Sequence, residues 1–194
     1  AVSNEPEPWI DAPPMAYTDF VKWQADMLVS SAGESLWAYW REQLRGVPAV
    51  LDLPTDHSRP KRQTFNGGIC TAEVDPVLCA TLEGIALKEG TTLYAILLAA
   101  FQVLIYRHTG QSDFVLGSPM SGRTRPEFSK TLGYFVNPVA IRADIDPGAP
   151  FTEHLRRTGQ TVADALEHQD FPLPHLVDRL AIRPDPSRSP LFQI

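Results

Sequence analysis

The segment TLGYFVNPVAIRADI, residues 131–145, indicates the fold class more clearly than any other part of the chain. From Val139 onward, apolar residues occupy every second position, which is the pattern of a β-strand with one buried face. Extending this period towards the N-terminus places Asn137 on the apolar face together with Phe135. An amide there needs hydrogen-bond partners, because leaving it unpaired in a core costs about 1–3 kcal/mol. Pro138 follows directly and suggests a bulge or a strand edge.

The composition is that of an ordinary globular protein. The 194 residues are 43% hydrophobic and 21% charged, enough for one large domain or parts of two. Seventeen Lys and Arg against 23 Asp and Glu give a net charge of -6, which argues against nucleic-acid binding. Cys70 and Cys79 lie in no metal-ligand pattern. They are predicted to be buried thiols in a reducing compartment, with no disulfide and no metal site.

No part of the sequence predicts an association with a membrane. The longest apolar run, from Leu93 to Ile105, is interrupted by Gln102 and is too short to span a bilayer. No signal peptide opens the chain. A soluble, cytoplasmic protein is expected.

Strands and helices alternate along most of the chain. Residues 47–68 show no period and predict a linker. The run 91–109 is apolar all round and predicts a helix that is buried on several sides. This order favours an α/β sandwich layered around one sheet. Further helices are expected over 16–28, 31–45, 76–89, 150–168 and 173–180, and strands over 69–75, 113–118 and 131–145.

The sequence alone shows no self-contained catalytic constellation. Its five histidines are scattered, and it contains no G-x-S-x-G elbow, Walker loop or G-x-G-x-x-G motif. The segment SGRTRPEF, residues 121–128, suggests either an anion-binding loop or a polar loop with solvated arginines. The segment HQDFP, residues 168–172, suggests either a site or a helix end followed by a turn.

Five segments together resemble the condensation domain of non-ribosomal peptide synthetases. LGYFVNPVAIR resembles the family motif G-x-F-V-N-T-x-x-x-R, and HQDFPLPHLVDRL resembles H-Q-D-x-P-F-E. RPDPSRSPLFQI resembles R-D-x-S-R-N-P-L-F-Q, GSPMSGR matches a recurrent segment, and YTDFVKWQADML resembles Y-x-D-[FY]-x-x-W-Q. Each match is weak, but they occur in the family's order over about 175 of the 194 residues.

The chain also departs from the family pattern. The defining motif H-H-x-x-x-D-G does not occur in it, so no catalytic residue is expected among these residues. Pro138 replaces the usual threonine, and PLP replaces P-F-E. The resemblance implies an internal part of the domain. Residues 1–46 would end the first lobe, 47–68 would link the lobes, and 69–194 would form the first half of the second lobe.

The resemblance further implies a fold like that of chloramphenicol acetyltransferase, with two lobes and a channel between them. Two carrier proteins would present substrates tethered to phosphopantetheine, and an amide bond would form between donor and acceptor. No metal or redox cofactor would be needed. The expected partners are the carrier proteins, adjacent synthetase domains and the remainder of the condensation domain. An ester-forming, cyclisation or epimerisation relative, or a non-catalytic docking module, stays open.

The resemblance places several residues near the channel. They are Asn137, Ser121, Gly122, Arg123 and Tyr134. Asn137 would hydrogen-bond a pantetheine amide, or it would satisfy the backbone at a bulge. Gly122 would let the backbone approach a ligand closely. Arg123 would pair with a phosphate, or it would form an internal salt bridge.

Overall fold

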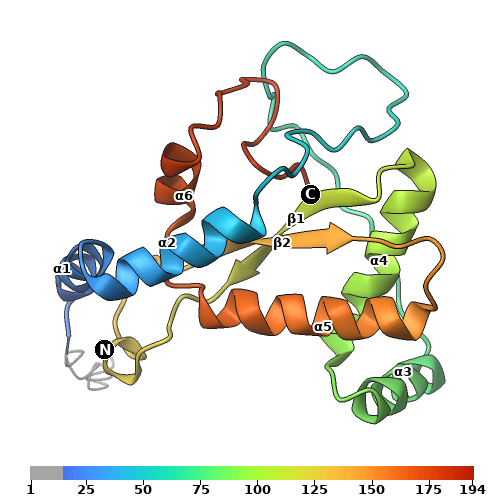
Figure 1. Ribbon diagram of the computed structural model, residues 1–194, viewed down its shortest axis with the longest axis horizontal. Coiled ribbons are helices and arrows are strands. Elements are labelled where there is room, and N and C mark those ends of the chain that lie inside the picture. Colours follow the sequence, from blue (N-terminus) through green and yellow to red (C-terminus); the bar gives the residue numbers. More distant parts are fainter. Residues whose placement is uncertain (1–14) are drawn as a thin grey trace, which may run out of the picture.

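The computed structural model describes residues 15–194 (Figure 1). Six α-helices, one 3₁₀ helix and two strands lie in this part of the chain. In chain order they are α1 Tyr17–Leu28, α2 Ser31–Gln43, α3 Pro76–Lys88, α4 Leu93–Thr109, β1 Asp113–Met120, η1 Pro126–Phe128, β2 Asn137–Asp144, α5 Phe151–Glu167 and α6 Leu173–Arg179. The predicted α/β class is confirmed, and α5 runs along the sheet.

The two strands form an antiparallel pair without a bulge. The register runs unbroken from Asp113 opposite Asp144 to Met120 opposite Asn137. Pro119 therefore faces Pro138, and the bulge suggested at Pro138 is absent. The amide of Gly117 donates away from β2, to Ile194 O at 2.7 Å. Since Pro119 lies two residues further on, its nitrogen also faces away from β2, and the proline pair removes no hydrogen bond from the ladder.

The largest hydrophobic core joins α2 to both strands and to α5 and α6. Trp40 of α2 is 1% exposed, and its indole Nε1 donates to His168 O at 3.0 Å. The other buried members of this core are Leu44, Val115, Val139, Ala140, Ile141, Val162, Ala165, Phe171 and Leu176. Residues on both sides of the predicted linker thus share one core, and the assignment of the three segments to lobes stays a prediction.

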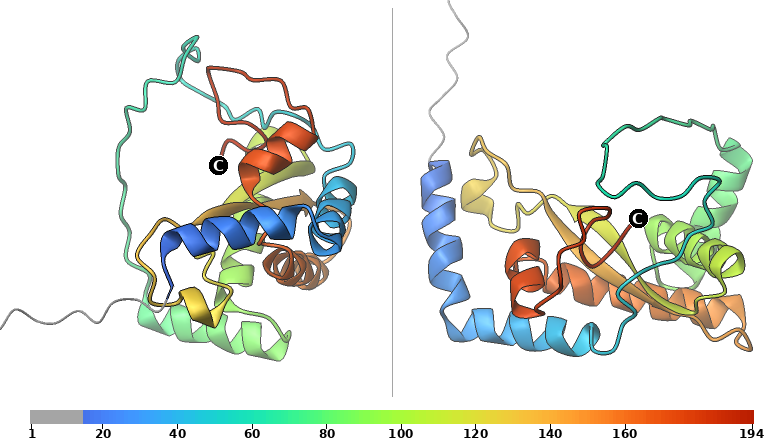
Figure 2. Two further views of the ribbon diagram at one scale, coloured as in Figure 1. Left: turned by 90° about the vertical axis from the view of Figure 1, so that its left-hand side faces the viewer. Right: turned by 90° about the horizontal axis from the view of Figure 1, so that it is seen from above.

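The strand expected over 69–75 is not formed. Residues 47–75 are irregular and run as a wide loop along the outside of the molecule (Figure 2). Ile69 is 95% exposed and Val74 is 53% exposed. The alternation of apolar residues was correct for a strand, but a strand also needs a neighbour for its backbone groups. The prediction of buried thiols is also wrong, because Cys70 is exposed and Cys79 is only half-buried.

The sequence predicted that helix α4 is buried on several sides, but one of its faces is exposed. It presents one apolar row to solvent, with Tyr94 44%, Leu97 50% and Leu104 49% exposed. The opposite side is buried, with Ala99 0% exposed and packed beside Leu155 of α5. An all-apolar sequence thus did not reveal which face the neighbouring elements cover.

Within residues 15–194, no single helix is long and apolar enough to cross a membrane. Helices α3 and α4 meet the length and composition criteria only as a pair, and that pair is bent by 100°.

His154 of α5 generates a prediction about pH. The side chain is 5% exposed, and burial together with the charge of Arg157 lowers its pKa, against a smaller opposite effect of Asp144. An unfolded histidine has a pKa of about 6.5, so protonation below that pH favours the unfolded chain. The free energy of unfolding should therefore fall as the pH drops from about 7 to about 5, and His154→Leu should reduce this fall.

Urea denaturation at the two pH values measures the effect. His57→Leu, which removes an exposed histidine, is the matched control and should keep the wild-type fall. An equal fall in wild type and His154→Leu would contradict the assignment.

Candidate functional site

The residues predicted to line a channel gather at one end of the sheet. Three of them follow β1 and two lie at or before the start of β2. Met120 pairs with Asn137, so the antiparallel strands bring the two segments together. The residues are Ser121, Gly122, Arg123, Tyr134 and Asn137.

The side-chain amide of Asn137 is fully engaged by the backbone of residues 169–173, which lead into α6. Its Nδ2 donates to Gln169 O at 2.8 Å and to Phe171 O at 2.9 Å. Its Oδ1 accepts from the amide of Leu173 at 3.0 Å. Asn137 thus satisfies backbone groups of its own chain, as one of the two hypotheses expected. These groups belong to the segment 169–173 and not to a bulge. A place in a substrate channel stays a prediction.

The segment 168–173 is held from several sides. The ring of His168 stacks on Tyr39 with 3.7 Å between centroids, and Thr124 Oγ1 donates to Asp170 Oδ1 at 2.8 Å. Burial raises the pKa of the Tyr39 phenol, and the charges of Asp164 and Glu167 add to this. The phenol therefore stays neutral against the imidazole. The motif HQDFP is thus the segment that α2, β2 and the loop after β1 all contact.

Arg123 makes internal contacts, but not the salt bridge that was one hypothesis. Its Nη1 donates to Phe128 O at 2.7 Å and to Thr131 O at 2.9 Å. Its guanidinium lies 4.1 Å from the centroid of the Phe135 ring, a cation–π distance. No acidic side chain within residues 15–194 forms an ion pair with it. Arg123 fastens the loop around η1 to the start of β2.

Gly122 is required by a close approach within the protein. Its φ is +65°, and a Cβ atom would lie 1.8 Å from Phe135 O. The expected close approach is therefore made to a backbone carbonyl of this chain. The hydroxyl of Ser121 accepts from the amide of Arg123 at 3.4 Å, which completes the tight turn.

The loop that leads into β2 presents apolar side chains outward. Leu132 is 79%, Tyr134 72% and Val136 40% exposed, whereas Thr131 just before this row is 1% exposed and Phe135 within it is 5% exposed. The backbone is fixed there, since Tyr17 of α1 donates its hydroxyl to Tyr134 O at 2.7 Å. An ordered backbone with an outward apolar row is suited to face another surface or a ligand.

A hollow of about 680 Å³ lies beside this site, between α1, α2 and the end of α5. It is lined by three carboxylates, Asp26, Glu167 and Asp170, and by Arg125. Arg125 forms an ion pair with Glu127, and the anion-binding hypothesis for residues 121–128 stays a prediction. No local pattern indicated this hollow, because α1 and the end of α5 are more than a hundred residues apart. No group of three His, Cys, Asp or Glu that could hold a metal occurs in the described part of the chain.

A family model described as the condensation domain matches residues 4–194. The chain belongs to the condensation domain family. It is 40% identical over 194 residues to a component of the linear gramicidin synthase of Brevibacillus parabrevis, covering all of this chain and 2% of that protein. It is 39% identical over 178 residues to a component of the plipastatin synthase of Bacillus subtilis (strain 168), covering 92% of this chain and 7% of that protein.

The fold is also that of solved condensation domains. The condensation domain from the Monacolin K polyketide synthase MokA aligns with a TM-score of 0.79 and 28% identity, over 90% of this chain and 43% of that one. The resemblance inferred from the motifs and the fold class are thus confirmed. The chain spans less than half of this solved domain and a small part of the synthases.

Replacing Asn137 by alanine should destabilise the fold. The substitution leaves the carbonyls of Gln169 and Phe171 and the amide of Leu173 without their partner. A partly buried site of this kind should cost roughly 1–3 kcal/mol of unfolding free energy. Urea denaturation measures this, with the exposed Asn66→Ala as the control. A loss no larger than that of Asn66→Ala would contradict the role given to the amide.

Proposed function

We propose that this chain forms part of a condensation domain that makes amide bonds in non-ribosomal peptide synthesis. The donor would be an acyl or peptidyl group and the acceptor an aminoacyl group, each tethered to a carrier protein. The similarity of the whole chain to part of a linear gramicidin synthase, together with the family match, is the observation that carries this proposal. A cytoplasmic location stays a prediction.

The proposed reaction sets clear chemical needs. The acceptor amine attacks the carbonyl carbon of the donor thioester, the carbon–sulfur bond breaks, and the amine proton leaves while the phosphopantetheine thiolate gains one. A base or hydrogen-bond acceptor must therefore lie within about 3.2 Å of the amine. Holding both tethered reactants in one channel supplies much of the acceleration. The family's histidine motif, which would provide the base, does not occur in these 194 residues.

The part of the reaction assigned to this chain is to shape the channel wall. The exposed apolar row of Leu132, Tyr134 and Val136, next to Ser121, would face the pantetheine arm or the opposite lobe. Asn137 and Arg123 would be positioning residues, because their polar groups hold the segments 169–173 and 126–131. Gly122 would serve the same purpose through its contact with Phe135 O.

An amide-forming assay with donor- and acceptor-loaded carrier proteins tests the proposal. The 194-residue chain alone should give no product, and a longer polypeptide that includes the histidine motif should give the amide. Within the longer polypeptide, Tyr134→Ala should lower the rate several-fold with little loss of stability, whereas Phe65→Ala, at an exposed aromatic residue of the loop 47–75, should not.

The outcomes separate the two parts of the proposal. Product from the 194-residue chain at the rate of the longer polypeptide would contradict the claim that this chain shapes the channel wall and does not supply the base. No amide from the longer polypeptide would overturn the reaction. Equal rates for Tyr134→Ala and Phe65→Ala would remove Tyr134 from the channel and leave the reaction standing.

A further inference from the structure

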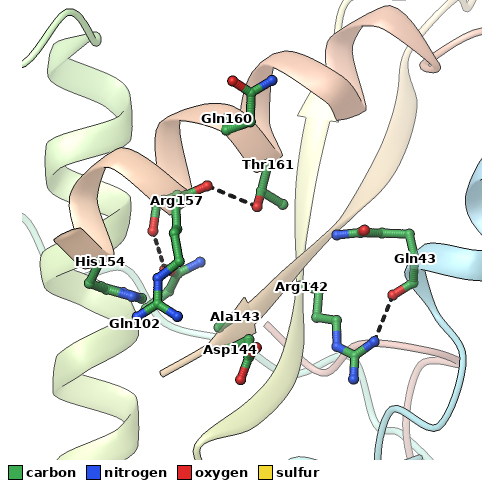
Figure 3. A pocket seen from close by; sticks show the side chains of 10 residues that line it. Gln43, Gln102, Arg142, Ala143, Asp144, His154, Arg157, Gln160 and Thr161 are labelled. Atoms are coloured by element: carbon green, nitrogen blue, oxygen red, sulfur yellow. Dashed lines mark hydrogen bonds between the residues drawn. The ribbon is translucent and has the colours of Figure 1, made fainter. Parts of the chain in front are cut away.

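A second hollow, remote from the predicted channel residues, lies between α4, α5 and β2. Its volume is about 420 Å³ (Figure 3). Figure 3 shows Gln102 of α4 and His154 and Arg157 of α5 converging on one side of it. Asp144 and Arg142 of β2 lie along its wall.

Two of these side chains are almost completely buried and have polar atoms without a partner in the described chain. Gln102 is 1% exposed; its Oε1 accepts from Thr158 Oγ1 at 2.9 Å, but its Nε2 has no partner within residues 15–194. His154 is 5% exposed, and neither of its ring nitrogens has a partner there. Polar groups buried to this degree are normally hydrogen-bonded, so Gln102 Nε2 and the single N–H of the neutral His154 ring indicate a ligand that supplies acceptors.

The guanidinium of Arg157 shows which kind of acceptor fits. Its Nε and Nη2 are buried and have no partner in the described chain. These two nitrogens form one edge of the guanidinium, which matches the two oxygens of a carboxylate. Arg142 uses the same edge in this molecule, where Nε and Nη2 donate to the two oxygens of Asp113 at 2.8 and 2.7 Å.

The other charges around the hollow do not neutralise Arg157. Arg142 is occupied by Asp113 and by the carbonyl of Gln43. Asp144 is exposed and forms no ion pair with Arg157. Burial and the positive charge of Arg157 lower the pKa of His154, so its ring is neutral at neutral pH and adds no charge.

We propose that this hollow binds a carboxylate, with Nε and Nη2 of Arg157 as a two-pronged donor and Nε2 of Gln102 as a third donor. The carboxylate belongs either to a small free anion or to an acidic side chain on an extended segment. An extended segment would also find backbone amides that are unpaired within residues 15–194, along the edge of β2 that faces away from β1. Ile145 donates to Ser112 O, so the odd-numbered residues of β2 pair with β1 and the amides of Arg142 and Asp144 face away from it.

Binding is measured by the NMR signal of the Arg157 Nε–H during titration with acetate. A saturable shift is expected with acetate and none with acetamide, its neutral analogue, or with sodium chloride.

Arg157→Lys keeps the positive charge but replaces the planar guanidinium, which offers two parallel donors, and should weaken acetate binding about ten-fold or more. Asp144→Asn removes a competing carboxylate and should leave the affinity equal or higher. Gln102→Met, which removes the third donor at similar size, is a second variant that should also weaken binding.

A capped peptide of alternating valine and threonine with a central glutamate distinguishes the two sources. Binding about ten-fold tighter than acetate, with shifts at the backbone amides of Arg142 and Asp144, identifies the extended segment. Equal affinity for peptide and acetate identifies a small free anion. Equal responses to acetate and chloride would overturn the proposal. So would acetate binding that appears only in Asp144→Asn, together with a lower melting temperature of that variant, because Asp144 would then be the partner of Arg157 in solution.

Discussion

The side-chain amide of Asn137 is the contact on which the arrangement of the elements around the sheet depends. Its two donors and its oxygen bind the backbone at Gln169, Phe171 and Leu173. This fixes the first residue of β2 against the turn between α5 and α6. The amide lies on the apolar face because the groups that it satisfies are there, so a polar residue within an alternating strand is stable.

Other contacts reinforce the same junction from neighbouring elements. The indole of Trp40 donates to His168 O, and Phe171 is buried beside it in the main core. The hydroxyl of Thr124 ties Asp170 to the loop after β1. Removing one of these contacts leaves others, but among the hydrogen bonds within residues 15–194 only the one from Leu173 to Asn137 joins β2 to α6, beside the apolar packing of Leu176. The position of the proposed channel wall is therefore a consequence of packing far from any reacting atom.

Local pattern was sufficient for some elements and insufficient for others. Helix α5 and the part 137–144 of the expected strand 131–145 were predicted correctly, because their apolar periods lie within the segments themselves, whereas residues 131–136 form no strand. The strand expected over 69–75 failed because a strand also needs a partner, which no local pattern supplies. The motifs identified the family and drew attention to Asn137, but its partners lie 32 to 36 residues away. The hollow around Arg157 was missed because Gln102 and Thr158 meet only in the folded chain.

Amide hydrogen exchange at Leu173 tests the central role of Asn137 most directly. Leu173 is the first residue of α6, and the amide of a first helical residue has no partner within its own helix. Its protection therefore reports the bond to Asn137 Oδ1. The amide of Leu173 should exchange slowly in the native chain and lose its protection in Asn137→Ala, while the ladder amide of Ile141 stays protected. Rapid exchange of Leu173 in the native chain, or unchanged protection in Asn137→Ala, would contradict this role.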